Sequence, residues 1–488
     1  MQLGKRPGAV AAVRARLTTE ADPADRRRLG RILLAMRTPE AALALEPVIG
    51  DLAGDDLVAA TRRLRETGDD GTAALARLAA DTRLGDDTRI AVIRQLVELS
   101  SPASTLALLD AAVAAPAPAV ADALARALTG RPLPRLLEAA ATAPTAPVLW
   151  RAITTAAARA AADERARAIA AMIVALDAVG DFIVEGTLAR GLATLGDGDT
   201  LTRLDAWLAA RPPGARTIAL RTVAARALGD NPSAPALEHL ARAARDADAG
   251  VRLAALAGLD RLAPADGAGP AWTSADGAAR RAAADRAIGE LLTGDEAWPE
   301  IRRGAASALG ARCDAPDPAA RLAQAVDRDP DVTVAGAALA SLVQCRADGV
   351  ARRLIDVAAD GERALPLRVR ALELVPALGD RAVVLPSLLD LVRGWRRSAF
   401  EARAARELAR RGLIALGRLG GDGVADELIA ALGDGAAPEI AAAAAIGLGA
   451  MGPACPATAA ALLADLSTSG SPEVAAAARS ALPRCRGQ

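Results

Sequence analysis

The chain has 488 residues and a formal net charge of zero, with 59 basic and 59 acidic side chains, so its overall charge gives no attraction to nucleic acid or to an anionic membrane. A single compact core rarely serves a chain this long, which leaves several globular domains or one repeat array. Hydrophobic residues make up 52% and aromatic residues 1%, so the helices of such an array are rich in Ala and Leu and bury little surface each.

The amino-terminal residues predict helices over 9–17 and 25–36 with only loose periodicity, as expected of a terminal unit that keeps one polar face. We therefore assign residues 1–55 to a helical capping region. The apolar run after the basic start covers only residues 9–13. It is too short for a secretory signal, which favours a cytoplasmic protein.

Clear helical segments begin at residues 57–64 and 72–80, and a repeated pattern then governs the chain. An aliphatic anchor is followed eight positions later by Leu, which places both residues on one helical face. These pairs are Val120/Leu128, Val184/Leu192, Leu220/Leu228, Val251/Leu259, Val334/Leu342, Leu408/Leu416, Ile440/Leu448 and Val474/Leu482. Neighbouring anchors stand 31 residues apart from 220 to 251, 33 from 301 to 334 and 32 from 408 to 440. A period in the low thirties is typical of a solenoid, so we assign residues 56–485 to one repeat array.

Residues 299–310 show the pattern most completely. Pro299 suits the first helical position, Glu300 complements the positive end of the helix dipole, and Gly310 predicts a left-handed stop. Ile301 and Leu309 provide the anchor and its leucine. We therefore expect an all-α, right-handed superhelical solenoid of about 14 helical pairs.

Two insertions interrupt the period, and both carry residues suited to binding. The first, near 263–277, is a Pro/Gly/Asp-rich loop with Trp272, and the second, near 393–400, carries Trp395, Arg396 and Arg397. Insertions in a solenoid fall in its loops, often on the binding face, and Trp and Arg are frequent binding hot spots. These residues are candidate partner-binding anchors. The alternative is that each tryptophan folds back onto a helix.

The units resemble HEAT repeats, in particular the short bacterial variety typified by phycobilisome-lyase-like repeats. In that family an acidic turn precedes a second helix that opens with Val-Arg-x-x-Ala and closes with Ala-Leu-Gly, and the matching pieces here are 228–230, 246–258 and 296–310. The resemblance implies a ladder of turn acids and second-helix arginines, here Asp246 with Arg252 and Glu296 with Arg302. Arg252 and Arg302 are therefore further candidates for partner binding, with the pinning of neighbouring repeats as the alternative. Elsewhere the arginine position holds Ala121, Glu185, Ala335, Ala441 or Ala475.

Motifs for catalysis and metal binding are absent or have structural explanations. His239 is the only histidine, which excludes a dihistidine metal site, and we interpret it as a helix-surface residue. The Gly-x-Gly-x-x-Gly at 447–452 closes a helix, whereas a dinucleotide fingerprint opens one after a strand. The acidic turn at 196–199 lacks the later ligands of a calcium loop. We expect no catalytic residue, no cofactor and no metal, and no membrane span, because Pro453 and Pro456 interrupt the longest uncharged run.

The four cysteines occupy matched places in neighbouring repeats, Cys313 with Cys345 and Cys455 with Cys485. Stacked helices lie about 8–10 Å apart, but loops at helix ends can bring such pairs within disulfide distance. Free thiols fit a chain without a secretory signal. Paired cysteines would instead indicate a periplasmic or secreted protein.

These features favour a non-enzymatic scaffold or adaptor that binds another protein. The alternative is a nucleic-acid-binding protein or a DNA-glycosylase-type enzyme of the HEAT-like group. A basic stripe along the inner helices would favour this alternative. The neutral charge and the scattered tryptophans speak against it.

Overall fold

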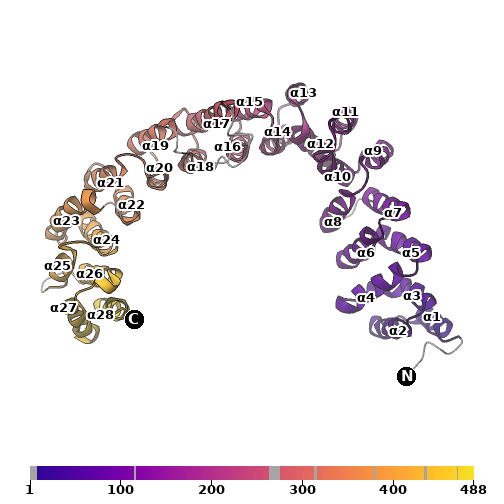
Figure 1. Cartoon of the computed structure of the whole chain (residues 1–488), viewed down its shortest axis with the longest axis horizontal. Coiled ribbons are helices and arrows are strands. Elements are labelled where there is room, and N and C mark those ends of the chain that lie inside the picture. Colours follow the sequence, from indigo (N-terminus) through magenta and orange to yellow (C-terminus); the bar gives the residue numbers. More distant parts are fainter. Residues whose placement is uncertain are drawn as a thin grey trace. The chain divides into compact units, whose positions relative to one another are not determined.

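The computed structural model describes residues 8–114, 117–262, 275–312, 316–378, 381–433, 437–469 and 471–487. Within these ranges all secondary structure is helical, in 28 α-helices and three short 3-10 helices joined by turns (Figure 1). The structure confirms the predicted all-α solenoid. In the described part of the chain, no helix is both long enough and apolar enough to cross a bilayer.

The chain divides into two compact units, Met1–Leu240 and Ala241–Gln488. The helices of unit 1 are α1 (Ala9–Thr19), α2 (Pro23–Met36), α3 (Pro39–Leu43), η2 (Glu46–Asp51), α4 (Gly54–Arg65), α5 (Asp69–Ala80), α6 (Asp86–Leu99), α7 (Pro102–Val113), α8 (Pro118–Leu128), α9 (Leu133–Thr142), α10 (Pro147–Ala157), α11 (Ala162–Ala178), α12 (Phe182–Leu195), α13 (Gly198–Ala209) and α14 (Ala215–Leu228). The boundary falls inside α15 (Ala234–Ala243).

Unit 2 contains the remaining helices. They are α16 (Ala249–Leu262), α17 (Ala275–Thr293), α18 (Pro299–Gly310), α19 (Pro316–Arg328), α20 (Val332–Gln344), α21 (Val350–Ala359), α22 (Leu365–Leu374), η3 (Val375–Ala377), α23 (Arg381–Arg397), α24 (Arg403–Leu419), α25 (Val424–Leu432), α26 (Pro438–Ala450), η4 (Gly452–Ala454), α27 (Ala457–Ser469) and α28 (Pro472–Cys485).

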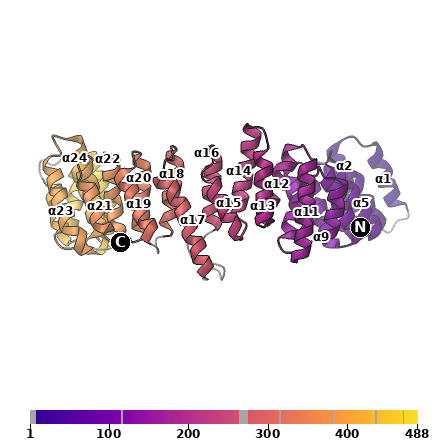
Figure 2. The same ribbon diagram turned by 90° about the horizontal axis from the view of Figure 1, so that it is seen from above.

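Within each unit the odd-numbered and even-numbered helices form two layers (Figure 1, Figure 2). In unit 1 each even-numbered helix from α4 to α14 packs beside the next even-numbered helix, and the same holds from α16 to α28 in unit 2. Because each helix contacts only its neighbours, the core of each unit is a strip between the two layers. We call the exposed surface of the even-numbered helices of unit 1 the even-helix face.

The predicted anchors form this core. All the anchors are buried, and so are their partner leucines, apart from the half-buried Leu482. Pro299 occupies the first position of α18, as predicted. Asp197 caps α13 by accepting a hydrogen bond from the Thr200 N–H at 3.0 Å, so the acidic turn at 196–199 begins a helix.

Gly310 does not provide a left-handed stop. It is the last residue of α18, and it is not among the residues with positive φ. A Cβ at this position would stand 2.5 Å from Ser341 Oγ and 2.6 Å from Ser341 Cβ on α20. The glycine is therefore needed for close packing of α18 against α20.

The Gly-x-Gly-x-x-Gly segment also serves packing. A Cβ on Gly447 would stand 2.7 Å from the Leu413 carbonyl oxygen of α24, and a Cβ on Gly449 would stand 2.7 Å from Ala481 Cβ of α28. Successive residues of an α-helix turn by about 100°, so two glycines two positions apart lie on opposite sides of α26. They allow α24 and α28 to approach α26 closely from both sides.

The second expected insertion is not a loop. Residues 393–397 end α23, and only 398–402 connect α23 to α24. No proline follows Pro386 within α23, so none interrupts residues 393–397. Arg393 and Arg396 also bind Glu427 of α25 and so hold this end of the helix. Residues 263–274 of the first insertion lie outside the described residues.

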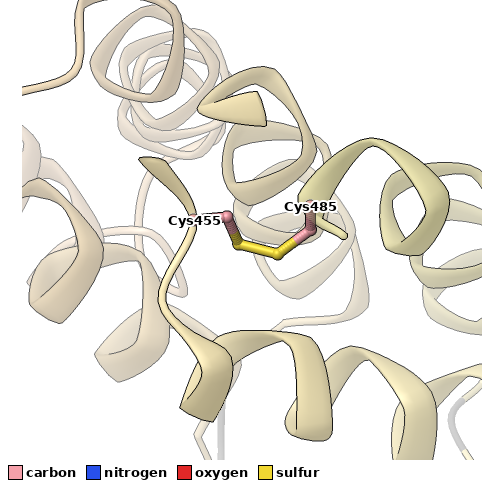
Figure 3. Close-up of a disulfide and its surroundings, with 2 residues drawn as sticks. All are labelled: Cys455 and Cys485. Carbon is pink, nitrogen blue, oxygen red and sulfur yellow. A yellow bond between two sulfur atoms is a disulfide. The ribbon is translucent and has the colours of Figure 1, made fainter. Parts of the chain in front are cut away.

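The last repeat is closed by a disulfide between Cys455 and Cys485 (Figure 3). Their Cα atoms are 5.1 Å apart, and the bond joins the turn after η4 to the end of α28. The expectation of free thiols therefore does not hold for Cys455 and Cys485. Cys345 is also disulfide-bonded. Cys313 lies outside the described residues, so its pairing with Cys345 stays a prediction.

Candidate partner-binding surface

Trp395, a predicted anchor, packs inside the repeat. The side chain is half-buried, and its ring atoms Cζ3 and Cε3 lie 3.5 and 3.8 Å from where a Cβ on Gly412 would stand. The ring therefore covers Gly412 of α24, as in the alternative in which a tryptophan folds back onto a helix. Trp272, the other predicted tryptophan, lies outside the described residues.

Arg396 is held by an ion-pair cluster between α23 and α25. Its Nη1 pairs with Oε1 of the buried Glu427, and its Nη2 donates to the Ala430 carbonyl at 2.8 Å. Arg393 Nε donates to the other oxygen of Glu427 at 2.8 Å. Two guanidinium groups thus neutralise one buried carboxylate, as a buried charge requires. Arg397 is exposed and makes no hydrogen bond or ion pair with the described residues.

Arg252 and Arg302 form a ladder that is offset by one repeat from the expected one. Arg252 binds Glu296 at 2.5 and 2.8 Å, and Arg302 binds Asp329 at 2.7 and 2.9 Å. The acid six residues earlier contributes only its main-chain oxygen: Asp246 O accepts from Arg252 Nη1 at 2.9 Å and Glu296 O from Arg302 Nη1 at 2.8 Å. The expected side-chain pairs within one repeat are therefore wrong.

These ladder contacts stabilise the charged forms of their members. The hydrogen bond to Glu296 raises the pKa of Arg252, and the hydrogen bond to Asp329 raises the pKa of Arg302. Burial alone would raise the pKa of Glu296, but the hydrogen bonds from Arg252 and the Trp298 N–H lower it overall. Both arginines are mostly buried and fully bonded, so they join neighbouring repeats and offer little to a partner.

His239 is also an internal residue. Its side chain is only 5% exposed, and its Nδ1 lies 2.7 Å from Asp205 Oδ2 of α13. The interpretation of His239 as a helix-surface residue is therefore wrong. The physical reason is the α13–α15 contact, which places a carboxylate where the imidazole can bury itself with a polar partner.

A hollow on the even-helix face of unit 1 has the properties of a binding surface. It has a volume of about 710 Å³ and crosses α8, α10, α12 and α14. We call it the apolar groove, defined by Pro118, Pro147, Phe182, Ile183, Leu220 and Val223. Phe182 is 42% exposed and Ile183 is 66% exposed. Single exposed apolar residues are common, but two adjacent ones over an apolar hollow are typical of an interaction site.

The start of α12 holds these two side chains in place. Asp181 caps the helix by accepting hydrogen bonds from the Ile183 N–H at 2.9 Å and the Val184 N–H at 3.0 Å. The Arg216 guanidinium stands over the Phe182 ring, 5.6 Å from its centroid. The local sequence therefore fixes Phe182 and Ile183 without burying them.

Behind the groove lies a buried carboxylate. Glu185 is fully buried, and its Oε2 accepts hydrogen bonds from Arg216 Nε at 3.2 Å and Nη2 at 2.5 Å. Arg211 Nη2 lies 2.8 Å from Oε1 and stacks over the Trp207 ring, 4.0 Å from its centroid. Glu185 comes one residue after its anchor, at the position where Arg252 and Arg302 stand in other repeats. In this repeat the acid therefore takes the place of the ladder arginine, and its arginine partners, Arg211 and Arg216, come from later in the chain.

A second hollow of about 740 Å³ crosses α4, α6 and α8 on the same face. We call it the basic hollow, defined by Arg62, Arg65, Arg94 and Arg126. The sequence reasoning missed both hollows. One signal for the basic hollow was available, because Arg62, Arg94 and Arg126 follow one another at intervals of 32 residues.

No protein-family profile matches the chain, and no curated protein matches it. Solved structures are similar at low identity. Human deoxyhypusine hydroxylase in complex with glycerol is 18% identical over 64% of this chain and 99% of its own, with a TM-score of 0.24. Yeast importin-β (Kap95p) is 12% identical over 97% of this chain and 72% of its own, with a TM-score of 0.41. Kap121p bound to Pho4p is 12% identical over 94% and 52%, with a TM-score of 0.42.

These structures are HEAT-repeat solenoids, and the likeness concerns the fold alone. The phycobilisome-lyase-like subtype has no matching profile and stays a prediction.

Proposed function

We propose that the chain is a non-enzymatic scaffold that binds an extended segment of a partner protein in the apolar groove of unit 1. The observation that carries the proposal is the exposure of Phe182 and Ile183 over a hollow that spans four even-numbered helices. Burial of such side chains is worth about 1.5–3 kcal/mol each when they are fully covered.

The dimensions of the groove favour an extended occupant. Packed helices stand about 8–10 Å apart, so the three steps from α8 to α14 cover roughly 24–30 Å. An extended chain advances about 3.3 Å per residue, which makes this roughly eight residues of a partner. A compact ligand would leave most of the groove open.

The charged residues of the groove support a binding role. Asp122 is paired with Arg151 at 2.6 Å, and Asp181 is occupied as the cap of α12. Histidine and cysteine are absent from the groove lining. An acid–base or nucleophilic pair would need such groups within hydrogen-bond reach of each other.

The test is site-specific photo-crosslinking in the cells that produce the protein. A photoreactive amino acid replaces Ile183 in one variant and Val174, an equally apolar residue that is 70% exposed on α11, in the control. We expect crosslinks to one partner peptide from position 183 and none from 174, and loss of partner binding in Ile183→Asp but not in Val174→Asp. Equal labelling from both positions would contradict the proposal.

The compartment is a separate proposal. We infer that the chain works in an oxidising compartment, periplasmic or extracellular, because disulfides such as Cys455–Cys485 persist there and are rare in the cytoplasm. Alkylation of intact cells before lysis tests it. A protein whose four cysteines are all alkylated at that stage would favour the cytoplasm.

A further inference from the structure

A row of arginines runs along the even-helix face of unit 1. Arg62, Arg94 and Arg126 are exposed and lie on the successive even-numbered helices α4, α6 and α8. Each stands two residues before the buried leucine of its helix, Leu64, Leu96 or Leu128. Arg190 of α12 has the same position relative to Leu192 and lines the apolar groove. α10 contributes no arginine to the row, because its one arginine, Arg151, is paired with Asp122. The row therefore has three members at the basic hollow and one, Arg190, at the apolar groove on the same face.

The four arginines of the row have no partner among the described residues. Many arginines in the described part of the chain pair with a carboxylate, but the side chains of Arg62, Arg94, Arg126 and Arg190 make no hydrogen bond or ion pair with a described residue. In the basic hollow the single acid is Glu98, 3.6 Å from Arg65. The hollow therefore carries an excess of positive charge that nothing within it neutralises.

Repeat packing does not require these arginines. The equivalent positions on the even-numbered helices α16, α18, α20, α24, α26 and α28 of unit 2 hold Ala257, Ser307, Ala340, Ile414, Ile446 and Ser480. The same fold is therefore built without a basic residue at this place. Four guanidinium groups aligned on one face repel one another, and a negatively charged occupant would remove this repulsion.

We propose that the arginine row binds an acidic stretch of the same partner segment whose apolar part fills the apolar groove. This inference rests on the proposed function and specifies the chemistry of the partner. Guanidinium groups bind carboxylates in a two-point geometry that lysine cannot reproduce. Helices about 8–10 Å apart present one arginine for about every third residue of an extended chain. The segment is therefore acidic at about every third position on the α4–α8 side and apolar on the α10–α14 side.

A peptide fits this surface better than a single-stranded nucleic acid does. Sequence-tolerant binding of single strands uses aromatic side chains on which bases stack, and the basic hollow has no aromatic lining residue. The adjoining apolar groove is lined by Phe182, Ile183, Leu220 and Val223, which suit apolar side chains better than a phosphate backbone. The basic stripe that would favour the nucleic-acid alternative is nevertheless present in unit 1, so that alternative is one arm of the test.

The test is fluorescence anisotropy with the full chain and three labelled probes. The first is an 18-residue peptide with Glu at every third position of its first half and Leu and Val in its second half. The second has Lys in place of Glu, and the third is a 20-nucleotide oligo-dT strand. The variants are the triple change Arg62→Gln, Arg94→Gln, Arg126→Gln and a matched control with Arg83→Gln, Arg135→Gln, Arg167→Gln. The control arginines are 88%, 69% and 60% exposed and lie away from both hollows.

We expect the acidic peptide to bind, the Lys peptide to bind much more weakly, and the row variant to lose on the order of tenfold in affinity while the control does not. Equal affinity of the row variant and the wild type would overturn the inference. So would a row-dependent preference for oligo-dT, which would establish the nucleic-acid alternative. Ile183→Asp separates the two proposals. If Ile183→Asp loses binding and the row variant does not, the apolar groove remains the binding site and the proposed acidic stretch of the partner is wrong.

Discussion

Arg252 binds Glu296 across a repeat junction, through Nε to Oε2 at 2.5 Å and Nη2 to Oε1 at 2.8 Å, at a sequence separation of 44. The side chains are 14% and 3% exposed. A two-point, nearly buried ion pair of this kind fixes the distance and angle between α16 and the turn before α18. Arg302 and Asp329 repeat the arrangement at the next junction.

Breaking one side of this pair should strongly destabilise unit 2. Arg252→Met leaves the Glu296 carboxylate buried without its partner, and such losses cost about 3–5 kcal/mol in the free energy of unfolding. The double variant with Glu296→Gln should cost less than the sum of the two single changes. Urea unfolding followed by circular dichroism gives the values. Arg245→Gln, which breaks the exposed pair with Glu290, should change the free energy by about 1 kcal/mol or less.

The same pair should make stability depend on pH in the acid range. The pKa of Glu296 is lowered in the folded state, so its contribution is fully present above the ordinary glutamate pKa of about 4.3 and is lost as pH falls through the lowered folded value. In Arg252→Met the hydrogen bond from Arg252 is gone and burial still raises the pKa of Glu296, so the folded-state pKa rises towards the unfolded value. The contribution of Glu296 is then no longer lost as pH falls. The melting temperature of the variant should therefore fall less between pH 7 and pH 3 than that of the wild type, and equal falls would contradict this.

Two helix glycines should respond oppositely to alanine. A Cβ on Gly417 would stand 2.1 Å from the Gly447 carbonyl oxygen, so Gly417→Ala must push α24 and α26 apart and should cost about 1–3 kcal/mol. Gly394 of α23 has no atom within 4 Å of its Cβ position. Gly394→Ala should therefore be neutral or stabilise by up to about 1 kcal/mol. Thermal unfolding of the two variants decides the matter.

The disulfide should stabilise the carboxy-terminal repeat. The bond closes a loop with a sequence separation of 30, for which loss of chain entropy predicts roughly 3–4 kcal/mol. Non-reducing peptide mapping should recover Cys455 linked to Cys485. In Cys485→Ser, amide hydrogen exchange should quicken in α27 and α28 and remain unchanged in α16. Four alkylatable thiols in protein kept from air and reductant would contradict the pairing.

The two tryptophan candidates should behave differently. Trp395→Ala removes a ring from the surface of Gly412 and should lower the melting temperature while partner binding persists. Trp272 stays a candidate partner-binding anchor, so Trp272→Ala should weaken partner binding at an unchanged melting temperature. Pull-down and thermal unfolding of both variants test this. Loss of binding without loss of stability in Trp395→Ala would restore it as a binding anchor.

The sequence by itself determined the architecture. The eight-residue spacing from anchors such as Val120 to leucines such as Leu128 predicts helices with one buried face, and the low-thirties period predicts that these helices stack. The buried face of a helix and the stacking of successive helices depend on interactions within one helix or with its nearest neighbours. The spacing of apolar residues in the sequence is therefore sufficient to predict them.

Only the tertiary structure decided which residues meet across repeats. The acid nearest to Arg252 in the sequence is Asp246, but the stacking of repeats brings Glu296 to its guanidinium. For the same reason Gly310 proved to be a packing residue and His239 a buried one. The exposure of Ile183 and the alignment of Arg62 with Arg94 also depend on the rise and rotation from one helix to the next. A periodic sequence gives the order of the helices, but the side chains that face a partner are set by how closely those helices pack.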